Sequence, residues 1–189
     1  MTSRIKSGIF VIADIPGAVG ERIRTLQTTY DPRLSRFGRP HVTIVGSSGA
    51  GPILADTTVD ELRERLEPVA ADTPPIVLRF GRPSRFMQTP IVQLPLDPHG
   101  PLRTLHERIK TSGLRFARPR FFFTPHVTLN LYRELAPDEL KTLLAERFDE
   151  PVTIDAITCY FTRETGEMRE MITLALRGPA TSHPTEPQS

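Results

Sequence analysis

The 189-residue chain has no tryptophan and a single cysteine, Cys159, which lies within an apolar stretch. One cysteine cannot form a disulfide within the chain, and the CxxC and Cys/His patterns of zinc sites are absent as well. No apolar run approaches the ~18–20 residues that cross a bilayer. The N-terminal segment, Met-Thr-Ser-Arg-Ile-Lys-Ser-Gly, lacks the apolar core of a secretory signal. We therefore expect a cytoplasmic protein with no membrane segment, no disulfide framework and no metal or other cofactor.

The composition is that of an ordinary globular protein, with 38% hydrophobic and 24% charged residues. The net charge is only +2, which by itself does not indicate nucleic acid as a partner. Most of the basic residues are arginine, and the planar guanidinium suits bidentate phosphate recognition better than lysine does. The placement of these arginines is therefore more informative than their number.

One tetrapeptide occurs twice, once in each half of the chain. Residues 40–43 and residues 125–128 both read Pro-His-Val-Thr, and apolar residues follow each copy. In a strand, successive side chains point to opposite faces, so the histidine and threonine of each copy share one face and the valine lies on the other. We expect the two strands to meet and to build one site from matching halves. The predicted catalytic residues are His41, Thr43, His126 and Thr128.

The order of elements also repeats between the halves. Apolar runs and breakers predict strands at about 7–15, 40–46, 76–86, 91–96, 121–131, 152–161 and 168–176, and helices at about 19–30, 58–71, 101–112 and after Pro137. In both halves a strand, a helix and an arginine-bearing connector precede the motif strand. This pattern predicts an α+β fold of two pseudo-symmetric lobes. Each lobe would have a small, mainly antiparallel sheet with helices on its outer face, and a cleft would lie between the lobes.

The domain prediction is a single bilobal unit over residues 1–177, with a hairpin turn around Glu164–Gly166. Residues 178–189 are rich in Pro, Thr and Ser and are expected to be disordered. The glycine-rich segment 46–51 has neither a Walker lysine nor GxGxxG spacing, and we expect a flexible exposed turn there. His99 and His106 have no counterpart in the other half, so we expect structural roles for them.

The doubled pattern, His41-Val42-Thr43-Ile44 and His126-Val127-Thr128-Leu129, resembles the two-histidine (2H) phosphoesterase superfamily. Within that superfamily the chain is most similar to the 2′-5′ RNA ligase and cyclic phosphodiesterase branch, over roughly residues 5–177. The resemblance implies a bilobal pseudo-twofold fold, no metal, and a central cleft lined by both histidines and both threonines. It also shows departures from many ligase-like members, because Val45-Gly46-Ser47-Ser48 follows the first motif and Asn130-Leu131-Tyr132, with Arg133 offset, follows the second.

The chemistry of two facing imidazoles supports the same class of reaction. Opening a cyclic phosphodiester needs a base for the attacking water and an acid for the leaving sugar oxygen, on opposite sides of phosphorus. Imidazole, with a pKa near ~6.5, serves in either role near neutral pH. The threonine hydroxyls can donate hydrogen bonds to the oxygens that gain negative charge. In reverse, the same pair would join a 2′,3′-cyclic end to a 5′-hydroxyl without ATP. Because the halves are nearly symmetric, the sequence leaves open which histidine is the acid.

Arginine and aromatic residues near the motifs are candidates for substrate binding. Arginine beside aromatic side chains is a common means of holding single-stranded RNA, through phosphate contact and base stacking. The partners expected on this ground are RNA ends or a small cyclic nucleotide, and nothing indicates a protein partner. The predicted substrate-binding residues are Arg39, Arg118, Arg120, Phe122 and Tyr132.

Three alternatives to an RNA-end phosphodiesterase remain. A small cyclic nucleotide, such as an ADP-ribose cyclic phosphate, would suit the short loop after His41, which is poor in arginine. A catalytically idle protein that binds RNA or phosphate would keep the same cleft. A metal site through His41 and His126 is disfavoured, because two histidines and two threonines supply too few good ligands.

Overall fold

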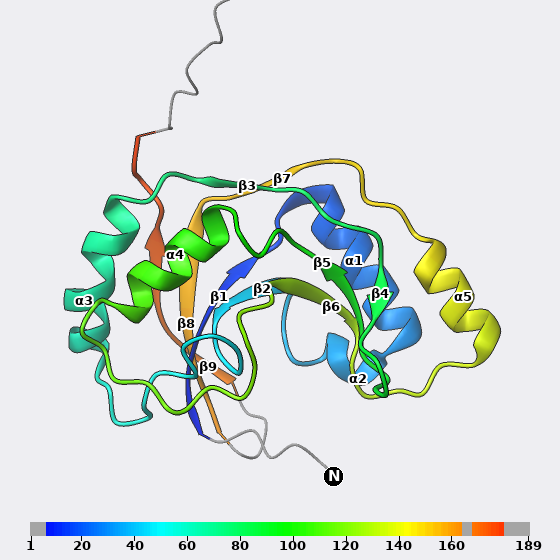
Figure 1. Cartoon of the computed structure of the whole chain (residues 1–189), viewed down its shortest axis with the longest axis horizontal. Helices are drawn as coiled ribbons and strands as arrows, with labels where there is room; N and C mark the ends of the chain where they lie inside the picture. The colour runs from blue at the N-terminus through cyan, green and yellow to red at the C-terminus, as the bar shows by residue number, and fades with distance from the viewer. Residues whose placement is uncertain (1–6, 164–167, 180–189) are drawn as a thin grey trace, which may run out of the picture.

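A single seven-stranded sheet carries both motif strands (Figure 1). The computed structural model describes residues 7–163 and 168–179. Its strands are β1 Gly8–Asp14, β2 His41–Val45, β3 Ile76–Leu78, β4 Ser84–Arg85, β5 Val92–Pro95, β6 His126–Asn130, β7 Val152–Ile154, β8 Ala156–Thr162 and β9 Met168–Ala175. Its helices are α1 Gly17–Tyr30, α2 Pro32–Ser35, α3 Val59–Ala71, α4 Pro101–Lys110 and α5 Pro137–Ala145. The sheet order is β4-β5-β6-β2-β1-β8-β9, and β3 pairs with β7 in a small second sheet.

The mixed α+β class is confirmed, but the prediction of a separate sheet in each lobe is wrong. The motif strands β2 and β6 pair with each other in antiparallel fashion at Val42 and Val127, which joins the two halves into one sheet. An unpaired strand edge leaves a row of backbone N–H and C=O groups without partners. Pairing β2 with β6 removes two such edges at the centre of the molecule.

The pairing of β2 with its neighbour β1 closely resembles the pairing of β6 with its neighbour β5. β1 lies antiparallel to β2 and β5 lies antiparallel to β6, and each pair shifts register once, opposite the residues just after the motif threonine. Outside these four strands the halves differ, because β8 and β9 extend one side while only the two-residue β4 extends the other. A twofold relation between whole lobes stays a prediction.

Two helices pack on the motif strand of the opposite half of the chain. The expectation that the helices of each lobe cover only that lobe's sheet is therefore wrong. Helix α1 packs on β6, and α4 packs on β2. Buried polar side chains make the connection: Gln27 of α1 donates to the Thr128 carbonyl at 2.7 Å, and Nδ1 of His106 in α4 lies 2.7 Å from the Ile44 carbonyl. Figure 1 shows α3 and α4 at one end of the molecule and α1, α2 and α5 at the other.

The alternation predicted for the motif strands determines which face joins the core. Val42, Ile44, Val127 and Leu129 are all fully buried. The motif histidines and threonines are half-buried on the opposite face. An antiparallel sheet commonly packs one face on the core and leaves the other accessible, and these strands follow that rule.

Several predicted strands are shorter or divided. The second motif strand begins at His126 instead of residue 121, since Pro125 has no N–H with which to extend a ladder. The predicted strand 76–86 divides into β3 and β4, and 152–161 divides at Asp155 into β7 and β8. The turn at Glu164–Gly166 and residues 180–189 of the predicted tail lie outside the described residues. The prediction of disorder is wrong at Gly178, which is buried and donates its N–H to the Thr73 carbonyl at 2.9 Å. No helix of the described part of the chain is long and apolar enough to cross a membrane.

The glycine-rich segment 46–51 is held by backbone bonds, so the prediction of a flexible exposed turn is wrong. Gly49 donates its N–H to the Phe121 carbonyl at 2.9 Å, and the Arg120 N–H donates to the Ser47 carbonyl at 3.0 Å. Gly51 is buried, with φ of +84°. The loop after the first motif is therefore bonded to the connector that leads into the second.

Candidate active site

Both motif histidines are fixed by the same backbone contact. Nδ1 of His41 lies 2.8 Å from the carbonyl oxygen of Arg39, and Nδ1 of His126 lies 2.8 Å from that of Thr124. Because a carbonyl oxygen can only accept a hydrogen bond, this contact assigns the proton to Nδ1 in each neutral ring. The second nitrogen, Nε2, is then the one with the free lone pair.

The proline of each motif supports this geometry. Pro40 and Pro125 stand between each histidine and the carbonyl that it contacts, and proline fixes the local φ angle. The carbonyl of Pro40 accepts from the Ile15 N–H at 2.8 Å, and that of Pro125 accepts from the Leu96 N–H at 3.0 Å. Each histidine therefore follows a turn that is bonded to the strand beside it.

The register between the motif strands determines how the four polar side chains lie. With Val42 opposite Val127, antiparallel pairing sets His41 opposite Thr128 and Thr43 opposite His126, all on one face. Directly opposite side chains have Cβ atoms about 5 Å apart and diagonal ones about 7–8 Å. The two imidazoles are thus diagonal neighbours, each beside a hydroxyl, with room for a small anionic group between them.

Electrostatics distinguishes the two histidines although their backbone contacts match. Burial lowers the pKa of His41, while its bond to Arg39 and the nearby carboxylate of Asp14 act in the opposite direction. Burial also lowers the pKa of His126, where the bond to Thr124 opposes the shift and the charge of His41 adds to it. The pair is therefore asymmetric, since a carboxylate accompanies only His41.

The sheet register explains this asymmetry. Asp14 of β1 stands opposite His41, whereas Pro95 of β5 stands opposite His126. The ring of Phe86 also meets the His126 ring edge-on, with centroids 5.3 Å apart. His41 thus has a polar, anionic neighbour and His126 has apolar ones.

A hollow of about 470 Å³ adjoins His41. It is lined by β1, by the connector from Phe37 to Arg39, and by β8 and β9. Its polar side chains include Asp14, Tyr160 and Glu170. This volume is within the range of small-molecule sites, about 300–1,000 Å³.

The predicted substrate-binding residues are divided by the fold. Arg39 lines the hollow, while Arg118, Arg120 and Phe122 are exposed on the connector before β6 and do not line it. Phe122 is 93% exposed, which leaves both faces of its ring open to a ligand. Their role in binding stays a prediction.

Tyr132 is tied to the hollow indirectly. The Arg33 guanidinium lies 4.2 Å from the centroid of the Tyr132 ring, and the Phe37 ring is 5.9 Å away. Burial raises the pKa of the Tyr132 hydroxyl. Tyr132 therefore supports Phe37, which lines the hollow, without lining it itself.

Sequence reasoning missed several polar residues on the site face. Asp14 is the one charged residue in the strand 7–15, and a lone carboxylate in an apolar run is the signal that could have identified it. Gln93, opposite Thr128, is only 7% exposed and has an Oε1 atom without a hydrogen-bond partner. Tyr160 and Glu170 come from strands that follow both motifs, and no spacing rule connected them to the histidines. Only the sheet order brings them to this face.

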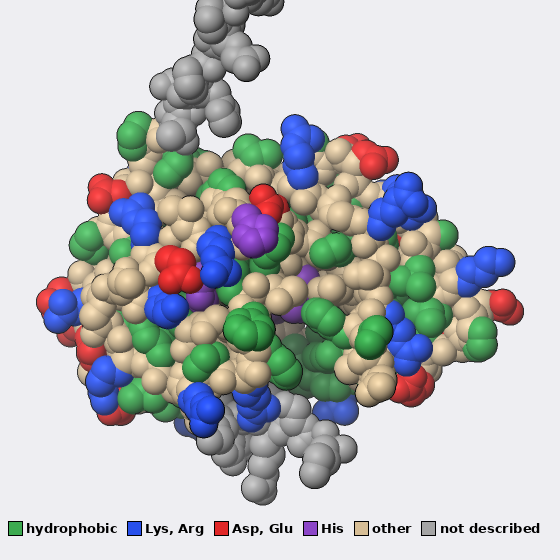
Figure 2. All heavy atoms as spheres, in the orientation of Figure 1, with side chains coloured by type: hydrophobic (Ala, Val, Ile, Leu, Met, Phe, Trp, Pro, Cys, Tyr) green, Lys and Arg blue, Asp and Glu red, His purple; other side chains and the backbone are tan. Residues whose placement is uncertain are grey.

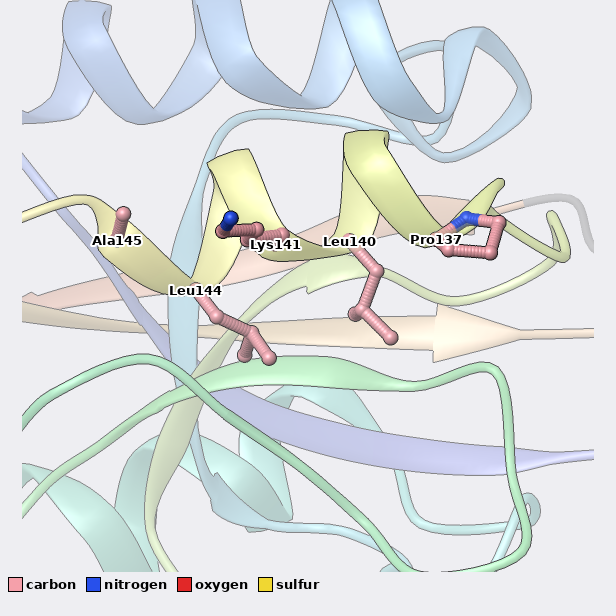
Figure 3. A pocket seen from close by; sticks show the side chains of 5 residues that line it. All are labelled: Pro137, Leu140, Lys141, Leu144 and Ala145. Atoms are coloured by element: carbon pink, nitrogen blue, oxygen red, sulfur yellow. The ribbon is translucent and has the colours of Figure 1, made fainter.

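A second depression, of about 480 Å³, is formed by helix α5 alone (Figure 3). Leu140 and Leu144 point to the same side of the helix, and Lys141 is the one titratable residue that lines the depression. Apart from the amine of Lys141, the residues that line this surface carry no acid, base or nucleophile. It is not a candidate for the chemistry of the motifs.

The distribution of charged side chains and of possible metal ligands limits the chemistry that the site can perform. Figure 2 shows Lys and Arg side chains interspersed with Asp and Glu over the visible face, not gathered over one element. Among residues 7–163 and 168–179, no three His, Cys, Asp or Glu side chains lie close enough together to hold a metal ion. The groups available for chemistry at the motif strands are therefore two imidazoles and two hydroxyls.

Comparison with known structures supports the fold. Escherichia coli LigT complexed with ATP has a TM-score of 0.54 and 19% identity, covering 90% of this chain and 98% of that chain. LigT in its apo form has a TM-score of 0.53 and 21% identity, covering 90% of this chain and 97% of that chain. At these identities the likeness shows a shared fold.

Sequence relatives extend over most of the chain. A protein of Geobacillus kaustophilus, provisionally named a phosphoesterase, is 29% identical over 185 residues, which cover 94% of this chain and 99% of the relative. A protein of Geobacillus thermodenitrificans with the same provisional name is 29% identical over 149 residues, which cover 75% of this chain and 81% of the relative. These names and the family indicate a phosphoesterase enzyme. The profile of the 2′-5′ RNA ligase superfamily matches residues 15–166, which include both Pro-His-Val-Thr motifs, and the chain therefore belongs to that superfamily.

Proposed function

We propose that this protein is a metal-independent phosphodiesterase that opens 2′,3′-cyclic phosphates by paired-histidine acid/base catalysis. The observation that carries the proposal is the matched pair of imidazoles. Each ring has Nδ1 bonded to a backbone carbonyl at 2.8 Å and Nε2 free, and the two lie on one face of the central strand pair. An in-line displacement needs one acid and one base on opposite sides of phosphorus, and this pair supplies both.

The two histidines take different roles. His41 has Asp14 beside it, which favours the charged ring, whereas the charge of His41 disfavours a second charge on His126. We therefore assign the proton to Nε2 of His41, the ring that has a carboxylate opposite it in the sheet, whereas Pro95 stands opposite His126. His126 is the base and His41 is the acid.

The reaction then balances without another participant. Water attacks phosphorus, and its proton passes to Nε2 of His126. The bond from phosphorus to one of the two sugar oxygens breaks, and that oxygen takes the proton from Nε2 of His41. Thr43 and Thr128 donate hydrogen bonds to the non-bridging oxygens, where negative charge accumulates. The product is a phosphate monoester with a free neighbouring hydroxyl.

The reverse reaction would join ends through a 2′-5′ linkage. A 5′-hydroxyl would replace water as the nucleophile, and the cyclic ester is already activated. The superfamily name supports this direction for relatives in general. LigT, the fold relative, has been crystallised with phosphate and with 3′-AMP, which supports a phosphate-bearing nucleotide as the class of ligand.

A small cyclic nucleotide is the second candidate substrate. The hollow of about 470 Å³ beside His41 suits a compact ligand. An ADP-ribose cyclic phosphate belongs to this class. The third candidate, an RNA- or phosphate-binding protein without turnover, requires the same face and differs only in lacking activity.

The test is turnover in EDTA with single histidine variants. An oligonucleotide with a 2′,3′-cyclic phosphate and the small cyclic nucleotides are offered to the wild type, His41→Ala and His126→Ala. We expect turnover in EDTA and a loss of about 10²–10⁴-fold in each variant. His99→Ala, which removes an exposed histidine outside the motifs, is the matched control and should keep full activity.

Two results would contradict the proposal. Turnover that EDTA abolishes would refute a metal-independent reaction, and tight binding of every substrate with no turnover would favour the idle binding protein. The assignment of roles has its own test with 2′-deoxycytidine 3′-(para-nitrophenyl phosphate), whose leaving group needs no protonation. His41→Ala should keep most activity on this substrate, while His126→Ala should not. The opposite ranking would reverse the roles.

A further inference from the structure

One wall of the hollow beside His41 is a chain of hydrogen-bonded polar side chains from β8 and β9. The hydroxyls of Thr158 and Thr173 lie 3.0 Å apart, and Thr173 donates to Oε1 of Glu170 at 3.0 Å. The Tyr160 hydroxyl donates to Oε2 of Glu170 at 3.4 Å. Cross-strand pairing of Thr158 with Thr173 and of Tyr160 with Glu170 sets all four side chains on the site face.

The direction of each bond in this wall follows from proton counting. A carboxylate can only accept, so Thr173 and Tyr160 must donate their single hydroxyl protons to Glu170. Thr173 then has no proton left for Thr158, and Thr158 must donate to Thr173. All hydroxyl protons of the wall are used within it. What remains for a ligand is lone pairs, so this wall accepts hydrogen bonds and binds donors.

The charges around the hollow favour a ligand group that carries no phosphate. Asp14 and Asp155 line the hollow together with Glu170. Among the described lining residues, the cations that could offset them are Arg39 and, when protonated, His41. A phosphate among three carboxylates would be repelled, whereas a neutral group with N–H or O–H donors would be attracted.

An aromatic ring completes the lining. Phe37 lines the same hollow, and its ring centroid lies 5.9 Å from that of Tyr132, which does not line it. Aromatic side chains bind the flat faces of bases by stacking. A flat ring with donors on its edge therefore matches both the aromatic surface and the accepting wall.

We propose that this hollow is a nucleobase subsite that selects bases carrying an amine at C4 of a pyrimidine or at C6 of a purine. Cytosine and adenine present N–H donors to Glu170 and Thr158, whereas uracil and hypoxanthine present a carbonyl oxygen at the corresponding position. The inference rests on the proposed function, because it seats the base of the nucleoside whose cyclic phosphate lies between His41 and His126.

The test compares substrates that differ only at the amine. The ratio of kcat/KM for cytidine over uridine 2′,3′-cyclic phosphate, and for adenosine over inosine 2′,3′-cyclic phosphate, is measured with the wild-type protein. One discriminating hydrogen-bond pattern is expected to give a ratio of about 10-fold or more. A ratio within about twofold of unity for both pairs would overturn the proposal.

The variant Glu170→Gln tests the wall itself. It replaces one accepting oxygen with a donating amide at the same size, so the cytidine preference should fall to about unity or reverse in favour of uridine. Tyr160→Phe, which removes one bond that holds Glu170, should reduce the ratio severalfold. The matched control Glu64→Gln changes an exposed carboxylate on α3 and should keep the wild-type ratio. An unchanged ratio in both Glu170→Gln and Tyr160→Phe would refute the role of the wall.

A binding measurement separates this proposal from the proposed function. If the protein opens no cyclic phosphate, the function fails, but tighter binding of 3′-CMP than of 3′-UMP by calorimetry still supports the subsite. Equal binding of the two nucleotides overturns the subsite whether or not the protein turns over. Cytidine-selective binding that Glu170→Gln abolishes is the expected result.

Discussion

Removing the carboxylate of Asp31 should destabilise this protein more than any exposed acidic substitution. Asp31 is 1% exposed and lies between α1 and α2. Its Oδ1 accepts from the Leu34 N–H at 3.0 Å, and its Oδ2 accepts from the Leu131 and Tyr132 N–H groups at 2.8 Å and 2.7 Å. One side chain thus joins the start of α2 to the chain just after the second motif strand, where no ladder bond holds the backbone.

The magnitude follows from these three bonds. A hydrogen bond to a charged group contributes about 1.5–3 kcal/mol, and truncation to alanine leaves three N–H groups without an acceptor. Water that enters the vacated space recovers part of the loss, so we expect Asp31→Ala to lower the free energy of unfolding by about 3–5 kcal/mol. That is a large share of the roughly 5–15 kcal/mol of a typical domain. Asp31→Asn keeps one accepting oxygen and should lose about 1–2 kcal/mol.

The assay is urea denaturation at fixed pH, with the slope checked for constancy between variants. Asp56→Ala is the matched control, because Asp56 forms an exposed ion pair with Arg115 at 3.0 Å and should contribute only about 0–1 kcal/mol. A loss below about 1.5 kcal/mol in Asp31→Ala would refute the reasoning that these bonds hold the two segments together.

Two further predictions concern pH and the glycine-rich segment. Burial lowers the pKa of three histidines, namely His41, His106 and His126. Each of these histidines binds fewer protons in the folded state than in the unfolded state. The contribution of the neutral rings to the free energy of unfolding is therefore fully present above about pH 6.5 and is lost as the pH falls below that value. The urea midpoint should therefore drop between about pH 7.5 and pH 5.5, and an equal or higher midpoint at the lower pH would contradict this. Gly51→Ala should cost at least about 3 kcal/mol, because φ is +84° and the added Cβ would lie 2.0 Å from the Ala117 carbonyl oxygen. Gly17→Ala, at φ of +69° with nothing within 4 Å, isolates the backbone penalty and should cost only about 1–2 kcal/mol; equal losses in both variants would refute the clash.

Local sequence signals predicted most elements well. The apolar run of β1, the cap of α3 by Thr58 and the start of α5 at Pro137 all depend on neighbouring residues, and the structure has them where the patterns indicate. The errors concern strand boundaries and the glycine-rich segment, and each has an identifiable cause. Pro125 stops the extension of β6 towards residue 121, and Asp155 divides a run that reads as one strand. Segment 46–51 is rich in glycine because its backbone runs close to other atoms: a Cβ at Gly51 would meet the Ala117 carbonyl, and a Cβ at Gly49 would meet the His106 ring. Single-sequence reasoning cannot distinguish such close packing from flexibility.

The site was predicted only where it repeats in the sequence. The two histidines and two threonines could be found because the same four letters occur twice and strand alternation gives them one face. Asp14, Gln93, Tyr160 and Glu170 have no such repetition. They reach the same face through the sheet order β5-β6-β2-β1-β8-β9, which depends on pairings between residues far apart in the chain.

The sequence by itself determined the local units: the alternating motif strands, the proline-histidine turns and the amphipathic helices. These depend on backbone stereochemistry and on neighbours within a few residues. Only the tertiary structure decided that the two halves share one sheet, that α1 packs on β6 and α4 on β2, and that a carboxylate accompanies His41 but not His126. Those choices depend on which buried faces and unpaired strand edges fit together, and that is a property of the whole chain. The two motifs are therefore identical in sequence, but the fold surrounds them with different residues, so the two histidines have different environments.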